Sequence, residues 1–166
     1  MVGEAIVASI GGVSTTVRWL DRAGVEAYYA ARPGLVLPWP KDEWKENPPT
    51  MFLLRLHNQT RDELQFDPGL VSLIAQNGKR ELPLPYEDMY LRLGETEDAA
   101  PRLQSLQATL FSRFVVLRPG GQRDGLLLFR SLNPEMKLVS LELASFFVGG
   151  RSTPARFDFQ VLREPK

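Results

Sequence analysis

Apolar and polar residues alternate near the start of the chain in the way that a β-strand requires. Every second residue from Val13 to Leu20 shares one face of an extended chain, and that face is mostly apolar: Val13, Thr15, Val17 and Trp19. The apolar run Ala5–Ile10 precedes it, and only Gly11-Gly12 separates the two runs. A Gly-Gly pair between two strand-like runs predicts a β-hairpin.

Similar strand-sized runs recur along the rest of the chain, each bounded by turn residues. Met51–Leu56 is the clearest central strand, because it is almost continuously apolar and ends at a polar His-Asn-Gln-Thr segment. Asn77-Gly78 predicts a hairpin turn between Leu70–Ala75 and Glu81–Leu84. The other predicted strands are Leu64–Phe66, Leu126–Phe129, Leu138–Phe147 and Phe157–Leu162. About eight strand signals separated by turns are typical of a β-sandwich or barrel.

The pattern also predicts which side chains of these strands are buried. In Leu138–Phe147 the more apolar face consists of Val139, Leu141, Leu143, Ser145 and Phe147, and we expect this face to meet the core. We also expect Phe129 and Phe157 to be core residues.

A helical period interrupts the strands between residues 86 and 114. Tyr86, Met89, Tyr90 and Leu93 follow the i, i+3, i+4, i+7 spacing, which predicts a short helix over Tyr86–Leu93. A second helix is predicted over Arg102–Phe114, whose stripe is Leu103, Leu106, Leu110 and Phe114, with Pro101 at a favourable first-turn position.

The segment 32–50 holds five prolines and is predicted to be a long irregular connection. The residues before it, Val25–Ala31, are compatible with a short strand or with one helical turn. Four large aromatic residues lie in or beside this segment: Tyr28, Tyr29, Trp39 and Trp44. Exposed Trp and Tyr side chains are enriched in binding surfaces, so these four are candidate partner-binding residues. The alternative is that they pack down and close one end of the sandwich.

Length, charge and composition exclude several classes of protein. The 166 residues predict a single domain over 1–166, and the balance of 20 basic and 20 acidic residues gives no electrostatic footprint for nucleic acid. The absence of cysteine excludes disulfides, thiolate metal sites and cysteine nucleophiles. No run of 18 or more apolar residues is present, so any membrane tether would be a lipid anchor absent from this chain.

From Phe52 onward, the order of features resembles immunoglobulin-like β-sandwich domains of bacterial exported proteins and lipoproteins. The resemblance rests on FLLRLHNQT and FDPGLVSL, then on RPGGQRDGLLLF and a final FDFQV strand. It implies an antiparallel β-sandwich with an extracytoplasmic binding or structural role, and it transfers no catalytic residue. This chain departs from a minimal sandwich by its two inserted helices and its Pro- and Trp-rich first 50 residues.

The inventory of reactive residues is poor. His57 is the only histidine, and at the end of a predicted strand it is interpreted as a turn or edge residue. Acidic residues at 87–98 match no calcium-binding spacing, and Gly120-Gly121 and Gly149-Gly150 open no helix, so both glycine pairs are interpreted as β-turns. We therefore expect no catalytic residue, no metal ligand and no cofactor.

These observations predict a non-catalytic binding or structural module of a bacterial envelope or secreted protein, acting on an unknown protein or small ligand. Two alternatives stay open. One is a hydrolase with a carboxylate pair in a groove beside the helical insertion, and the other is a cytoplasmic adaptor or assembly protein.

Overall fold

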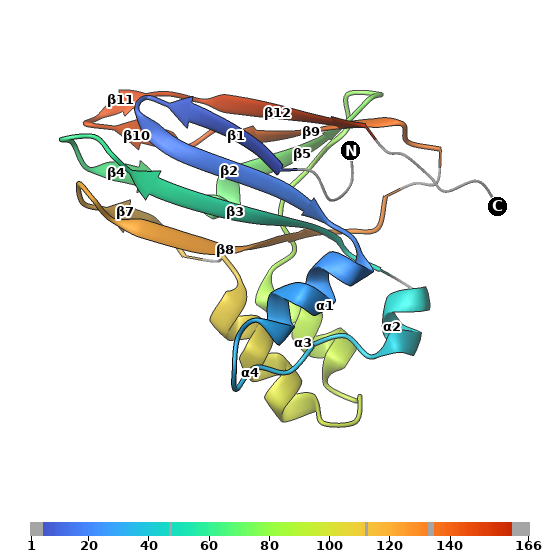
Figure 1. Cartoon of the computed structure of the whole chain (residues 1–166). Coiled ribbons are helices and arrows are strands. Elements are labelled where there is room, and N and C mark those ends of the chain that lie inside the picture. The colour runs from blue at the N-terminus through green and yellow to red at the C-terminus, as the bar shows by residue number, and fades with distance from the viewer. Residues whose placement is uncertain (1–4, 47, 112, 133–134, 161–166) are drawn as a thin grey trace.

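Two layers of antiparallel strands lie face to face in the computed structural model, and helices gather against one end of the first layer (Figure 1). The structure describes residues 5–46, 48–111, 113–132 and 135–160. The fold is mostly β, as the alternation predicts. None of the helices in these ranges is long and apolar enough to cross a membrane.

The front layer is a four-stranded antiparallel sheet with the order β1-β2-β3-β8. Its strands are β1 (Ala5–Ile10), β2 (Val13–Leu20), β3 (Thr50–Asn58) and β8 (Gln122–Phe129). The predicted hairpin over β1 and β2 is confirmed, and its two-residue turn places both Gly11 and Gly12 at positive φ. The predicted central strand is also confirmed, since β3 pairs with β2 on one side and β8 on the other.

The back layer consists of two four-stranded sheets, β11-β10-β4-β7 and β12-β9-β5-β6, placed end to end (Figure 1). The first contains β4 (Leu64–Phe66), β7 (Val115–Leu117), β10 (Phe146–Val148) and β11 (Arg151–Ser152). The second contains β5 (Val71–Ala75), β6 (Arg80–Glu81), β9 (Leu138–Leu143) and β12 (Ala155–Gln160). Backbone bonds bridge the break between the sheets: Asp67 donates to Ser145 over 3.2 Å and Thr153 donates to Phe146 over 2.8 Å. The two sheets therefore form one layer with a kink across it.

This kink corrects one expectation. The predicted strand Leu138–Phe147 is divided into β9 and β10. The alternation of buried and exposed residues shifts by one residue between these two strands. Val139, Leu141 and Leu143 are buried as predicted, but beyond the break Phe146 is fully buried while Phe147 is only partly so. A one-residue slip moves every later side chain to the other face. Phe129 and Phe157 are buried as predicted, whereas Val161 and Leu162 lie outside the described residues.

Two short helices come from the segment that connects β2 to β3. The ambiguous stretch Val25–Ala31 forms most of α1 (Arg22–Ala30), which begins where the Asp21 carboxylate accepts a 2.8 Å hydrogen bond from the Gly24 N–H. The Pro-rich segment is not wholly irregular, because α2 (Lys41–Glu46) begins directly after Pro40. Proline is tolerated at a helix start, where its missing N–H would have no partner inside the helix.

The two helices predicted between β6 and β7 are present, and the second is displaced. The helix α3 (Tyr86–Leu93) matches the prediction, whereas α4 spans Ala99–Thr109 rather than Arg102–Phe114. After α4 the chain pairs with the edge of β8, since the Phe111 N–H donates to the Leu126 carbonyl over 2.9 Å. That pairing replaces the last helical turn, and Phe114 is 54% exposed instead of buried.

The buried side chains form two cores that share the front sheet. One face of this sheet meets the back layer in the sandwich core, which includes Phe52, Leu54 and Phe129. Alternate residues of the same strands, such as Met51, Leu53 and Leu128, point the other way and pack with the helices in a second core. The helices cover one end of this outward face and leave its other end uncovered (Figure 1).

Candidate ligand-binding groove

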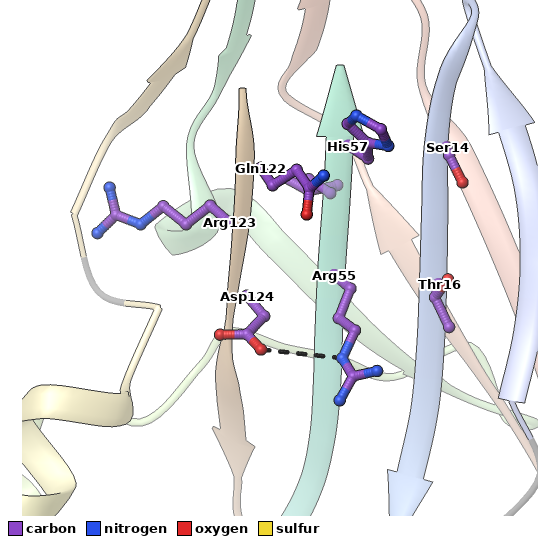
Figure 2. A pocket seen from close by; sticks show the side chains of 8 residues that line it. Ser14, Thr16, Arg55, His57, Gln122, Arg123 and Asp124 are labelled. Carbon is purple, nitrogen blue, oxygen red and sulfur yellow. Dashed lines mark ion pairs between the residues drawn. The ribbon is translucent and has the colours of Figure 1, made fainter. Parts of the chain in front are cut away.

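The uncovered end of the outward face carries a row of polar side chains from three neighbouring strands (Figure 2). The strand register places Thr16 of β2 beside Arg55 of β3, and Arg55 beside Asp124 of β8. The next outward row consists of Ser14, His57 and Gln122. These residues line a surface groove of about 630 Å³, called here the sheet groove, together with Leu56 and Arg123.

The position of the sheet groove follows from the sequence of the outward-facing residues. Along β3 they are Met51, Leu53, Arg55 and His57, so the face changes from apolar to polar halfway along the strand. β8 makes the same change in the opposite direction, because it runs antiparallel to β3. The apolar half needs a cover and receives the helices, while the polar half stays in contact with water. The groove therefore lies where the helical cover ends.

Positive charge exceeds negative charge in the sheet groove. Asp124 is the only carboxylate among the described residues that line it. It accepts a 3.2 Å hydrogen bond from Arg32, just after α1, and lies 3.8 Å from the Arg55 Nε. Arg55 has a side chain that is 58% exposed, and no other ion pair is seen for it in the described ranges. Because a guanidinium carries five N–H donors, most of the donors of Arg55 face solvent.

The other polar groups around Arg55 are neutral or lie at the margin. The Nδ1 of His57, which lines the groove, lies 3.4 Å from the Nε2 of Gln59, which is not among the lining residues. Arg123 lines the groove but points away from Arg55 in Figure 2, and its guanidinium lies 5.6 Å from the Phe111 ring centroid. The hydroxyls of Ser14 and Thr16 and the amide of Gln122 provide further donors and acceptors.

Arg32 connects the groove to the helices. Its guanidinium lies 3.5 Å from the Tyr28 ring centroid and donates to the Tyr28 carbonyl over 2.9 Å. Burial raises the pKa of the Tyr28 hydroxyl, and the positive charge of Arg32 opposes that rise. This stacking orients Arg32 toward Asp124, so the carboxylate of the groove is held by a residue that belongs to the helical region.

All four aromatic residues proposed from the sequence as candidate partner-binding residues pack in or against the second core. Tyr28, Tyr29 and Trp39 are buried, and Trp44 packs against them while partly exposed. The rings of Tyr28 and Tyr29 lie 5.2 Å apart and those of Trp39 and Trp44 lie 5.7 Å apart, both edge to face. Burial raises the pKa of the Tyr29 hydroxyl, which shares a 2.7 Å hydrogen bond with Thr109. Their packing inside the protein is what the structure shows, and a role in partner binding stays a prediction.

Sequence reasoning did not identify the sheet groove. The sequence predicts His57 to be a turn or edge residue, and no sequence pattern marks Ser14 or Thr16 as part of a site. The signal that was available is the switch from apolar to polar outward residues along β3. Pairing Arg55 with Asp124 required knowing that β8, about 70 residues later, lies beside β3. No group of three or more His, Asp or Glu side chains suited to a metal occurs among the described residues.

Known proteins add little to this picture. No protein-family model matches the sequence, and no curated protein matches it. Among solved structures, the chain is similar to the crystal structure of the yjhA protein from Bacillus subtilis, with a TM-score of 0.46. The two are 15% identical, and the similarity covers 87% of this chain and 79% of the other. The sheet groove is therefore interpreted from its own geometry.

Proposed function

We propose that this chain is a non-catalytic binding module that holds an anionic ligand, bearing a carboxylate or a phosphate, in the sheet groove. The observation that carries this proposal is the row Thr16–Arg55–Asp124, in which an exposed arginine lies beside a carboxylate already held by Arg32. A planar guanidinium binds carboxylate and phosphate oxygens through two parallel N–H donors. The groove volume is within the usual range of small-molecule sites, roughly 300–1,000 Å³.

The neighbouring neutral groups favour a ligand that also carries hydroxyls. Ser14, Thr16 and Gln122 surround the charged row with groups that both donate and accept hydrogen bonds. An acidic sugar or a small hydroxy acid presents such hydroxyls next to its anionic group. We therefore place polyhydroxylated anions first among the ligands to be tested.

The proposal includes an immunoglobulin-like arrangement of the sandwich, which the strand order supports. The strands β2-β3-β8 of the front layer and β12-β9-β5 of the back layer follow the A-B-E and G-F-C orders of that fold. In this assignment β1 is an addition at the edge, and the helical insertion lies between the third and fifth strands of the common pattern. An exported or envelope-bound location, implied by the resemblance of the sequence, is part of the same proposal.

A hydrolase with a carboxylate pair has less support from the cavities. Among the described residues, the sheet groove is lined by one carboxylate, Asp124. In the part of the chain that the structure describes, two cavities beside the helices are also lined by one carboxylate each, Asp98 in one and Asp88 in the other. Glycoside hydrolysis in its usual form requires two carboxyl groups across the scissile bond.

Isothermal titration with citrate, glucuronate and inorganic phosphate tests the ligand proposal. We expect at least one of these anions to bind the wild-type protein, more weakly as salt rises, and Arg55→Gln to weaken that binding at least tenfold. The matched control is Arg151→Gln, which removes an exposed arginine from β11 in the other layer and should leave the affinity unchanged. Equal loss in both variants, or no binding of any anion, would contradict the proposal.

The proposed location needs a separate experiment. Fractionation of cells that express the complete gene, tagged at its C-terminal end, should place the protein in the envelope or the medium. Recovery in the cytoplasmic fraction would favour the adaptor alternative and would leave the anion-binding proposal to be judged by titration alone.

A further inference from the structure

The strands at the edges of the three sheets differ in how they are protected against pairing with another chain. An edge strand offers a row of unpaired N–H and C=O groups, and proteins protect it by shortness, charge, proline or a covering segment. β6 and β11 have two residues each and β7 has three. β12 follows Pro154 and carries the charged residues Arg156 and Asp158. These four edges are therefore poor templates for a further strand.

The edge of β8 is covered or charged along its length. Phe111 donates to the Leu126 carbonyl over 2.9 Å and Leu84 donates to the Leu128 carbonyl over 2.7 Å, so other parts of the chain cover half of it. The other half carries Arg123 and Asp124. An incoming strand would meet bound carbonyls or charges.

The remaining edge, β1, has none of these protections in the part of the chain that the structure describes. Its sequence AIVASI is six residues long and contains no charge and no proline. Its one neighbour in the sheet is β2, and Val7 is 67% exposed. In Figure 1 the strand lies at the border of the front layer, with no helix beside it. An edge strand that is uncharged and uncovered along its length is suited to pair with a strand of another chain.

We propose that β1 pairs antiparallel with β1 of a second copy of this chain, so that the two front sheets form one continuous eight-stranded sheet. A twofold axis perpendicular to the sheet requires that opposed residues point to the same side. Centring the pair on Val7 satisfies this condition: Val7 opposes its own copy, Ala5 opposes Ser9, and Ile6 opposes Ala8. The two exposed Val7 side chains then cover each other, and the half-buried Ile6 and Ala8 lie on the side of the sandwich core.

A second copy suits this edge better than a charged partner strand, because β1 has no charge to complement. The nearest charged side chain on β2 is Arg18, which lies opposite Ala5 at one end of the strand. In the antiparallel pair the two Arg18 residues lie at opposite ends, so they do not repel at close range. Since the five other edges of the described sheets are protected, the pairing closes at two copies and does not continue into a fibre.

The absence of native cysteine allows a direct test of this register. Val7→Cys introduces the single thiol of the chain. Directly opposed residues in an antiparallel pair have Cα atoms about 4.5–5.5 Å apart, which is within the disulfide range. Mild oxidation of the full chain should convert this variant mainly to a disulfide-linked dimer. Val116→Cys is the matched control, because Val116 is 49% exposed on the edge strand β7, and it should remain mostly monomeric.

Sedimentation or light scattering across a wide concentration range tests the contact without a cross-link. The wild-type protein should approach twice the monomer mass as its concentration rises. Val7→Lys should remain a monomer because it opposes two like charges, whereas Val116→Lys should behave as wild type. A wild-type protein that stays monomeric up to millimolar concentration, or equal cross-linking of both cysteine variants, would overturn the proposal. Neither result would affect the sheet groove, whose residues lie on β2, β3 and β8.

Discussion

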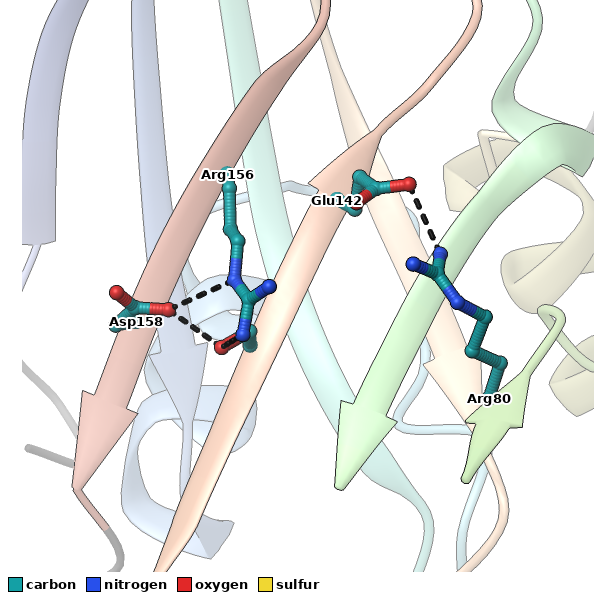
Figure 3. Close-up of polar contacts among 5 residues, drawn as sticks. Arg80, Glu142, Arg156 and Asp158 are labelled. Atoms are coloured by element: carbon teal, nitrogen blue, oxygen red, sulfur yellow. Dashed lines mark hydrogen bonds and ion pairs between the residues drawn. The ribbon is translucent and has the colours of Figure 1, made fainter. Parts of the chain in front are cut away.

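The outward faces of the two layers are built on the same alternation of side chains, yet they differ in how closely their charged side chains are paired. On the back layer, Arg156 lies 3.2 Å from the Asp158 carboxylate and also donates to the Ser140 hydroxyl, which itself donates to Asp158 (Figure 3). Arg80 and Glu142 form a 2.9 Å pair on the same face. In the sheet groove of the front layer, the nearest carboxylate to Arg55 is 3.8 Å away and is shared with Arg32.

The difference indicates which of the two faces is suited to a ligand. In the back-layer network the Arg156 guanidinium donates to both Asp158 and Ser140, so an anionic ligand would compete with these contacts even though both charged side chains are more than half exposed. In the sheet groove, donors are held in place by a strand and remain accessible. A second contrast is that the apolar end of the front face is covered by packed helices, whereas no helix lies against the outward face of the back layer in Figure 1, and Leu138 on that face is 51% exposed.

Removing the helical cover should have the largest effect. Trp39 is fully buried in the second core, and Trp39→Ala should lower the free energy of unfolding by about 3–5 kcal/mol. No acceptor for its indole N–H is found in the described ranges, so Trp39→Phe removes an unpaired buried donor and should cost distinctly less. Urea denaturation of both variants measures the difference. Equal or negligible losses would show that Trp39 does not hold the helices to the sheet.

Filling the space between Gly125 and Phe111, behind the sheet groove, should have the next largest effect on stability. A Cβ added at Gly125 would lie 2.7 Å from a ring carbon of Phe111, which packs across the inner side of β8. Gly125→Ala should therefore cost about 1–3 kcal/mol of stability through overpacking. Adding Phe111→Leu to this variant should recover part of the loss, as a double-mutant cycle would show. Simple addition of the two single losses would rule out the contact.

Local pattern predicted the strands well, because alternation is a property of neighbouring residues. The hairpin at Gly11-Gly12, the central strand after Pro49 and the burial of Phe129 and Phe157 all followed from it. The same pattern predicted the wrong burial for Phe147 and for Phe114. At Phe147 the reason is the break between β9 and β10, and at Phe114 it is the pairing of Phe111 with β8. At the break the partner strand changes from β5, beside β9, to β4, beside β10. Both outcomes therefore depend on pairing between segments that are distant in sequence, which a local pattern does not contain.

The sheet groove could not be predicted from the sequence for a similar reason. Arg55 and Asp124 are unremarkable surface residues in the sequence, and only the pairing of β3 with β8 brings them together. The four aromatic residues beside the Pro-rich segment attracted attention because large aromatics are common in binding sites. A tryptophan that completes a second core has the same sequence signature, and the burial of Trp39 illustrates this ambiguity.

Removing the carboxylate of the sheet groove should raise the affinity of the front face for anions and should lower the stability of the fold only slightly. Asp124→Asn takes away the negative charge next to Arg55, so the affinity for an anion that binds the wild type should rise several-fold. The ion pairs that are lost are partly exposed, and their loss should cost roughly 0.2–1 kcal/mol. Asp158→Asn, on the back layer, is the control and should not change the affinity. Weaker anion binding by Asp124→Asn would show instead that the carboxylate contacts the ligand.

The smallest expected effect is the pH dependence of the back-layer network. The hydrogen bond from Ser140 holds the pKa of the Asp158 carboxyl below its ordinary value, and Arg156 adds to this, while slight burial opposes it. Because the pKa is lower in the folded state than in the unfolded state, the carboxylate stabilises the fold above about pH 4 and this contribution is lost as pH falls through the folded-state value. Thermal midpoints should therefore fall less between pH 5 and pH 2 for Asp158→Asn than for the wild type. Ser140→Ala, which removes the main donor but keeps Arg156, should lie between them. Since the Asp158 side chain is 74% exposed, solvent screens the interaction and the shift should amount to a few degrees at most. Identical slopes for the three proteins would mean that the network does not influence the stability of the fold.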